Sequence, residues 1–139
     1  MRMKLIALTV TTMALGLAFG LAADTKVDPS KLPPASAQKG VTYAKDIQPL
    51  FEKTCFKCHG QEKQKGKLRL DSLAAALKGG ENGKDIISGK SAESPLVHAV
   101  AHVGDEDYFM PPPKNKDNLK QLSKEDIGLI RAWIDQGAK

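Results

Sequence analysis

The sequence predicts a small all-α protein of about four helices joined by long loops. Apolar residues recur at helical spacing just before position 55 and again after position 126. Ser94-Pro95 and Ser123 are typical helix starts, and no segment shows the sustained alternation of a half-buried strand. With 139 residues and 41% hydrophobic content, the chain is long enough to bury one core.

Residues 1–22 predict a secretory signal peptide. Arg2 and Lys4 precede an apolar run from Leu5 to Ala22, and small residues lie just ahead of Asp24. The alternative is an uncleaved membrane anchor, since the run is at the short end of spanning length. Its threonines and the small residues near its end favour removal. We therefore expect a periplasmic or otherwise exported protein, associated with a membrane only if this segment is retained.

Residues 23–42 are expected to form an extended linker with little core, because the segment is rich in proline, serine and lysine. Residues 43–139 then form one folded domain. A helix is expected to begin with Asp46 as its N-cap, which places Pro49 in the first turn, where its missing N–H costs little. The helical spacing of Ile47, Leu50 and Phe51 gives this helix one apolar face.

Three further helices follow from their capping residues. Asp71 or Ser72 is expected to cap a helix over 73–77 that Gly79-Gly80 ends. Ser94-Pro95 opens a helix to about Val103. Ser123 caps the last helix, and Gly137 lies just past its end. We expect the helix before position 55 to pack on this last helix, through Ile47, Leu50, Phe51, Ile130, Trp133 and Ile134.

The two cysteines of the chain both lie in the run Cys55-Phe56-Lys57-Cys58-His59. This spacing is typical of covalent haem c attachment, in which the two thiols form thioethers and the histidine ligates the iron. In an exported protein a pair of cysteines this close would otherwise tend to form a strained disulfide. The use that also employs His59 is the attachment of one haem c.

Met110 is the candidate for the second axial ligand, because it is the only methionine beyond the signal peptide. A thioether is a soft ligand that favours Fe(II) and raises the reduction potential. Pro111, Pro112 and Pro113 would stiffen the loop that holds it. The alternative is a methionine that fills a gap in the core. His98 and His102 share a helix face and are the other candidate ligands.

With both axial positions filled, the iron has no open site for a substrate, which favours a single-electron carrier over an enzyme. The alternatives are a peroxidase-like haem enzyme and a redox or gas sensor with an open or labile sixth position. A zinc site from Cys55, Cys58, His59 and His98 or His102 ranks last, because the adjacent Cys58 and His59 are poor simultaneous ligands of one tetrahedral ion.

The formal charge of +5 is too small to argue for nucleic acid. Lysines nevertheless gather around the cysteine motif, together with Arg69. They predict either a docking surface for an acidic redox partner, whether electron donor or acceptor, or an ordinary solvated face. Arg69 is also a candidate partner for a haem propionate. The basic residues are Lys53, Lys57, Lys63, Lys65, Lys67 and Arg69.

Residues 43–138 resemble the planctomycete-type cytochrome c domain. The resemblance rests on residues 46–50, on the motif 55–60 and on the string Gly66-Lys67-Leu68-Arg69-Leu70-Asp71. It continues through 76–80, 89–90, 94–96, Met110-Pro111-Pro112 and 127–138. It implies a class I-like cytochrome c fold of helices and long loops wrapped around one covalent haem c. It also implies Cys55 and Cys58 as attachment points, His59 as proximal ligand and Met110 as distal ligand. Residues 115–119 are extra length relative to the family.

Overall fold

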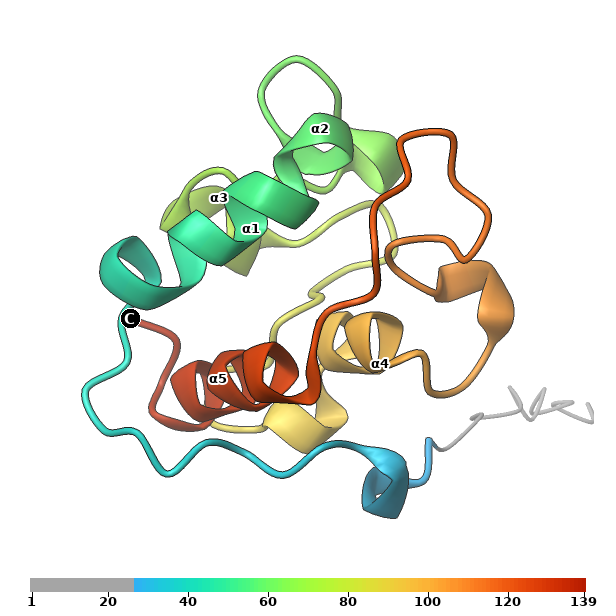
Figure 1. The fold of residues 1–139 in the computed structure, drawn as a ribbon. Coiled ribbons are helices and arrows are strands. Elements are labelled where there is room, and N and C mark those ends of the chain that lie inside the picture. The colour runs from blue at the N-terminus through green and yellow to red at the C-terminus, as the bar shows by residue number, and fades with distance from the viewer. Residues whose placement is uncertain (1–26) are drawn as a thin grey trace, which may run out of the picture.

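The computed structural model describes residues 27–139 (Figure 1). Within this range the chain forms five α-helices and no β-strand, which confirms the all-α class for this part of the chain. One-turn 3₁₀ and π-helical pieces and long loops connect the helices. The five helices are α1 (Gln48–Thr54), α2 (Phe56–His59), α3 (Leu73–Lys78), α4 (Pro95–Ala101) and α5 (Lys124–Asp135).

The structure has one more α-helix than the predicted four because the chain breaks at Cys55, between α1 and α2. Cys55 departs from helical geometry with φ −118° and ψ −37°. Its N–H still donates to the carbonyl of Phe51 at 2.7 Å. The break is therefore a local change in the backbone, and it falls on the first residue of the cysteine motif.

The first helical segment begins earlier than predicted, and Asp46 is not its N-cap. Residues Tyr43–Ile47 form a π-helical turn that leads into α1, and Thr42 precedes it as the cap. The Thr42 hydroxyl accepts from the N–H of Lys45, while the Asp46 carboxylate accepts from the N–H of Thr42 at 2.9 Å. An acidic side chain that reaches back to the cap residue belongs inside the first turn, which explains the displaced start.

The other predicted helix starts are confirmed. Ser72 caps α3 by accepting from the N–H of Ala75, and Ser94 precedes Pro95 at the start of α4. Helix α4 ends at Ala101, two residues before the predicted end, because His102 takes the left-handed conformation with φ 54°. Ser123 and Asp126 form the reciprocal capping box of α5.

The predicted packing between the first and last helices is confirmed by three aromatic rings. The ring of Trp133 lies 6.3 Å from that of Phe51 and 6.0 Å from that of Tyr43, measured between centroids. Trp133 and Phe51 are fully buried, and the indole N–H of Trp133 donates to the main-chain oxygen of Lys139 at 3.0 Å. Aromatic side chains bury large apolar areas, so this cluster forms the centre of the core.

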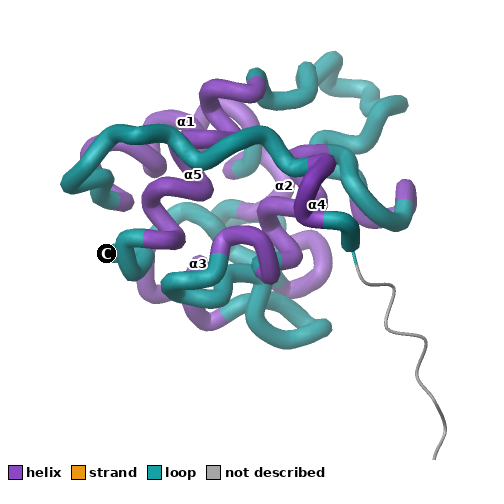
Figure 2. Tube along the Cα trace, turned by 90° about the horizontal axis from the view of Figure 1, so that it is seen from below, coloured by secondary structure: helices purple, strands orange, loops and turns teal. Residues whose placement is uncertain are grey.

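Residues 27–42, called the N-terminal arm below, run along α5 (Figures 1 and 2). The N–H of Ser36 donates to the carbonyl of Gly128 at 2.9 Å, and the Arg131 guanidinium donates to the carbonyl of Pro33. A β-carbon on Gly128 would lie 2.8 Å from the carbonyl oxygen of Pro34, so this close approach requires glycine. Two arm side chains are buried in the core, Leu32 and Val41.

Among residues 27–139, no helix is both long and apolar enough to cross a membrane. The predicted signal peptide, residues 1–22, lies outside the described residues.

Candidate functional site

The motif Cys55–His59 folds into a tight turn that ends at a glycine. The carbonyl of Cys55 accepts from the N–H groups of both Cys58 and His59, at 3.0 and 2.8 Å. A β-carbon on Gly60 would collide with the carbonyl oxygen of Phe56, so the chain can leave the turn here only with glycine. Both cysteines are half-buried free thiols.

A cavity of about 450 Å³ opens beside this motif. Its wall includes Cys55 and His59 from the motif, and Met110 from a segment much later in the chain. Cys58 is not among the residues that line it. Sites for cofactors and small ligands in proteins span roughly 300–1,000 Å³ and have mainly apolar walls with a few polar groups. The apolar part of the wall includes Leu68, Leu70, Leu96, Ala99, Val100 and Val103.

His59 combines burial with an unsatisfied ring nitrogen. Its Nδ1 atom is buried and has no hydrogen-bond partner among the described residues. Burial lowers the pKa of His59. The nearby carbonyls of Leu68 and Lys65 oppose this lowering, but neither completes a hydrogen bond to Nδ1. The ring is therefore kept neutral, which is the form that binds a metal.

The thiol of Cys55 is also kept neutral. Burial raises its pKa to about 11, and Sγ lies 3.3 Å from Oγ1 of Thr54. The carbonyl of Leu50 accepts from this same threonine hydroxyl at 2.8 Å. A sulfur so enclosed behaves as an apolar group, which suits a thioether better than an exchanging thiolate.

Met110 reaches the cavity from a loop that is anchored to α4. Its N–H donates to the carbonyl of Ala99 at 3.0 Å. Met110 is half-buried and packs against the core, so both its backbone and its side chain are held. The structure therefore brings Met110 to the same cavity as Cys55 and His59, although the motif and the loop lie far apart in the sequence.

The two other candidate ligands have different surroundings. His98 lines the cavity, and its Nε2–H donates to the carbonyl of Ala92 at 2.7 Å. His102 does not line the cavity. Its ring stacks on Phe109, with centroids 4.6 Å apart, and its Nε2–H donates to the carbonyl of Pro111 at 3.1 Å.

Two residues that line the cavity, Asp85 and Tyr108, have little or no signal in the sequence. Asp85 lines the cavity, and burial raises the pKa of its carboxyl while the N–H of Gly80 opposes this shift. Tyr108 lines the cavity and is 59% exposed. The only signal for Tyr108 is an aromatic residue close to Met110 in a polar loop.

Tyr43 is connected to His59 through main-chain groups. Its hydroxyl donates to the carbonyl of Leu70 at 2.7 Å, and the N–H of Leu70 donates to the carbonyl of His59, also at 2.7 Å. The helical pattern of the sequence gives no hint of this connection, because it joins residues from three separate segments.

Two of the basic residues around the motif form ion pairs. Arg69 donates to both oxygens of Asp71, at 3.0 and 2.8 Å, so its guanidinium already has a carboxylate partner. Lys57 pairs with Asp117 at 2.5 Å, and Asp117 belongs to the extra segment 115–119. Lys65 lines the cavity, while Lys63 and Lys67 are exposed.

No three histidine, cysteine, aspartate or glutamate side chains converge on a common point within residues 27–139. The zinc arrangement considered from the sequence is therefore not formed by these residues. Haem c fits better. A cavity of suitable size holds Cys55, His59 and a thioether in its wall, and one buried nitrogen of His59 has no partner.

Comparison with protein families matches residues 55–114 to the family described as Planctomycete cytochrome C. The predicted resemblance is confirmed over this segment, which includes the cysteine motif and Met110. The helices before Cys55 and after Lys114 lie outside the match. Comparison with curated proteins gave no match, and comparison with solved structures gave none either.

Proposed function

Because residues 55–114 match the planctomycete cytochrome c family, we propose that this protein is an exported monohaem c-type cytochrome that carries single electrons. Cys55 and Cys58 would attach one haem c, and His59 and Met110 would bind its iron. The observation that carries the proposal is the single cavity shared by Cys55, His59 and Met110.

Bound haem c supplies one-electron exchange between Fe(III) and Fe(II). The chain supplies the rest. The two sulfurs hold the group covalently, so it is not lost in an exported protein. His59 stays neutral and available as a ligand through its burial. The thioether of Met110 favours Fe(II), and the leucine and valine walls limit water, which also favours the less charged state.

Export and redox partners belong to the same proposal. The charge and apolar pattern of residues 1–22 supports export to the periplasm or beyond the cell. Exposed lysines next to the motif support an electron donor or acceptor with an acidic surface.

The test is spectroscopic and uses protein exported from cells that assemble cytochromes c. We expect haem that resists acid–acetone extraction and a low-spin ferric spectrum with the weak red band of Met–Fe(III) ligation. Met110→Leu removes the sulfur at similar volume, so it should abolish the red band and lower the reduction potential. Ser88→Ala, which alters an exposed hydroxyl bonded to Gly137, should leave both unchanged.

Colourless protein with free thiols would refute haem attachment. A red band that survives Met110→Leu would refute Met110 as the ligand. If the iron is high-spin, binds cyanide readily and turns over peroxide, the protein is a peroxidase-like enzyme and not an electron carrier.

A further inference from the structure

The loop that carries Met110 is fastened to the end of α4 at three successive residues. Before the methionine, the ring of Phe109 stacks on His102, with 4.6 Å between centroids and 9° between planes. At the methionine, the N–H donates to the carbonyl of Ala99 at 3.0 Å. After it, the carbonyl of Pro111 accepts from Nε2–H of His102 at 3.1 Å. One imidazole thus holds both neighbours of Met110.

The backbone of His102 is arranged for this contact. The residue ends α4 in the left-handed conformation, with φ 54° and ψ 47°, which is uncommon outside glycine but which histidine adopts more often than most other residues. The carbonyl of Ala99 accepts from the N–H of His102 at 3.2 Å as well as from that of Met110. Both contacts of the His102 ring, the stack on Phe109 and the hydrogen bond to Pro111, are to the methionine loop.

The position of His102 distinguishes it from the candidate ligands His59 and Met110, which line the cavity. Its ring does not line the cavity, whereas Met110 does, and its Nε2–H is used by Pro111. We propose that His102 is a positioning residue that clamps the loop 109–111 and so keeps the Met110 sulfur at the cavity. This inference rests on the proposed role of Met110 as the distal ligand, and it assigns His102 a role other than ligation.

The test compares His102→Ala with the wild-type holoprotein by two independent measurements. Hydrogen exchange reports on the Met110 N–H, whose hydrogen bond to Ala99 does not involve the sulfur. Cyanide affinity of the ferric protein reports on how readily the sulfur leaves. Loss of one hydrogen bond and one stacked pair should speed exchange of this amide, and tighten cyanide binding, by on the order of tenfold.

Two conservative variants separate the ring contacts. His102→Gln keeps an N–H donor of similar reach and should recover part of the wild-type behaviour. Phe109→Leu keeps the hydrogen bond to Pro111 and removes the stack, so it should give an intermediate effect. Ser91→Ala is the stability control, because Ser91 bonds to Asp135 and Arg131 of α5 and not to the loop.

The clamp is refuted if His102→Ala leaves both the Met110 amide and cyanide affinity unchanged. It is also refuted if Ser91→Ala produces the same changes at the same global stability. If Met110→Leu leaves the spectrum unaltered, Met110 is not a ligand of the iron. The exchange rate of the Met110 amide in His102→Ala is then the measurement that tests the clamp. If His102→Ala instead removes the low-spin spectrum while Met110→Leu does not, His102 is itself the ligand and the clamp is wrong.

Discussion

At the scale of single residues, Tyr43 shows how burial raises the pKa of a side chain. Its side chain is 5% exposed, and burial raises its pKa to about 12, with Asp71 and Cys55 adding to the shift. The folded state therefore holds this proton more tightly than the unfolded state. The stabilisation from Tyr43 is complete below pH about 10 and is lost as the pH rises through about 12.

We expect the alkaline loss of stability to be smaller in Tyr43→Phe, which keeps the aromatic packing but cannot ionise. Urea unfolding at pH 8 and at pH 11 measures the difference. At pH 8 the variant should itself be less stable by about 1 kcal/mol, because the Leu70 carbonyl loses its hydroxyl donor. An equal alkaline loss in both proteins would show that Tyr43 does not titrate in this range.

The sequence indicates the candidate residues of the site more readily than it indicates the contacts that hold them. Cys55, Cys58 and His59 are readable because haem attachment requires fixed spacing, and Met110 because no other methionine is present beyond residue 13. The bonds from Tyr43 to Leu70 and from His102 to Pro111 join side chains to distant main-chain carbonyls. Such contacts depend on where the folded backbone passes, which no local pattern records.

At the scale of elements, helix starts were predictable because capping is local. Ser72, Ser94 and Ser123 each precede the helix that they begin. The N-terminal arm was expected to be a linker with little core, and its composition does suit extended backbone. Its docking depends on the close approach at Gly128 and on the side chain of Arg131. Both lie in α5, far away in the sequence.

Gly128→Ala tests this docking. Alanine favours a helix by up to about 1 kcal/mol over glycine, but here its β-carbon would meet the Pro34 carbonyl at 2.8 Å. Forcing such contacts apart typically costs about 1–3 kcal/mol, so we expect a net loss of about 1 kcal/mol in urea unfolding. Limited proteolysis should cut the arm faster. Lys124→Ala, exposed on the same helix, should change neither, and a more stable Gly128→Ala would refute close docking.

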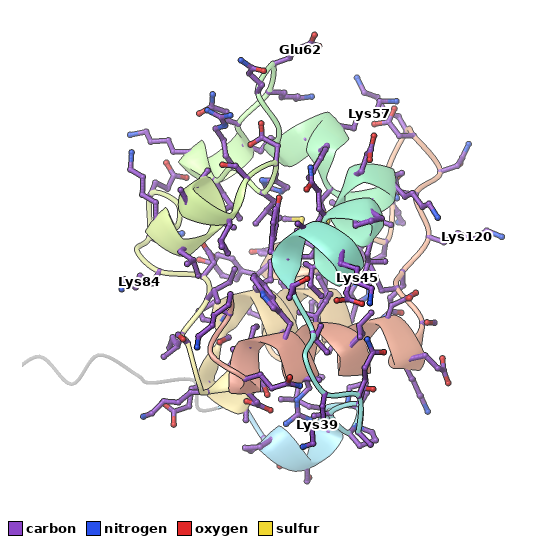
Figure 3. All side chains as sticks on the ribbon, turned by 90° about the vertical axis from the view of Figure 1, so that its left-hand side faces the viewer. Lys39, Lys45, Lys57, Glu62, Lys84 and Lys120 are labelled. Atoms are coloured by element: carbon purple, nitrogen blue, oxygen red, sulfur yellow. The ribbon has the colours of Figure 1, made fainter. Side chains whose placement is uncertain are left out.

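At the scale of the whole molecule, the distribution of charge should control electron exchange with charged partners. Lys57 and Glu62 lie at one end of the molecule, and Lys39 lies at the opposite end (Figure 3). Lys63, Lys65 and Lys67 belong to the segment after the motif, where they are exposed and Lys65 reaches the cavity wall. A positive field there would attract anions to the part of the surface next to the cavity.

Ferricyanide is an anion, so the rate at which it oxidises the reduced protein reports on this positive field. Replacing Lys63, Lys65 and Lys67 with glutamate should slow the reaction on the order of tenfold at low ionic strength and reverse its salt dependence. The matched control replaces Lys31, Lys39 and Lys45, which are exposed in or next to the arm and change the net charge equally. Equal slowing in both triple variants would mean that net charge, and not a local surface, governs the rate.

One main-chain oxygen atom connects two segments that lie far apart in the sequence. The main-chain oxygen of Lys139 accepts from the N–H of Tyr43 at 2.7 Å and from the indole of Trp133 at 3.0 Å, while the lysine side chain is exposed. The fold therefore depends on the presence of a residue at position 139 and not on its type. Substitutions of the side chain there are free to accumulate, whereas loss of this main-chain oxygen would leave the N–H of Tyr43 and the indole N–H of Trp133 without an acceptor.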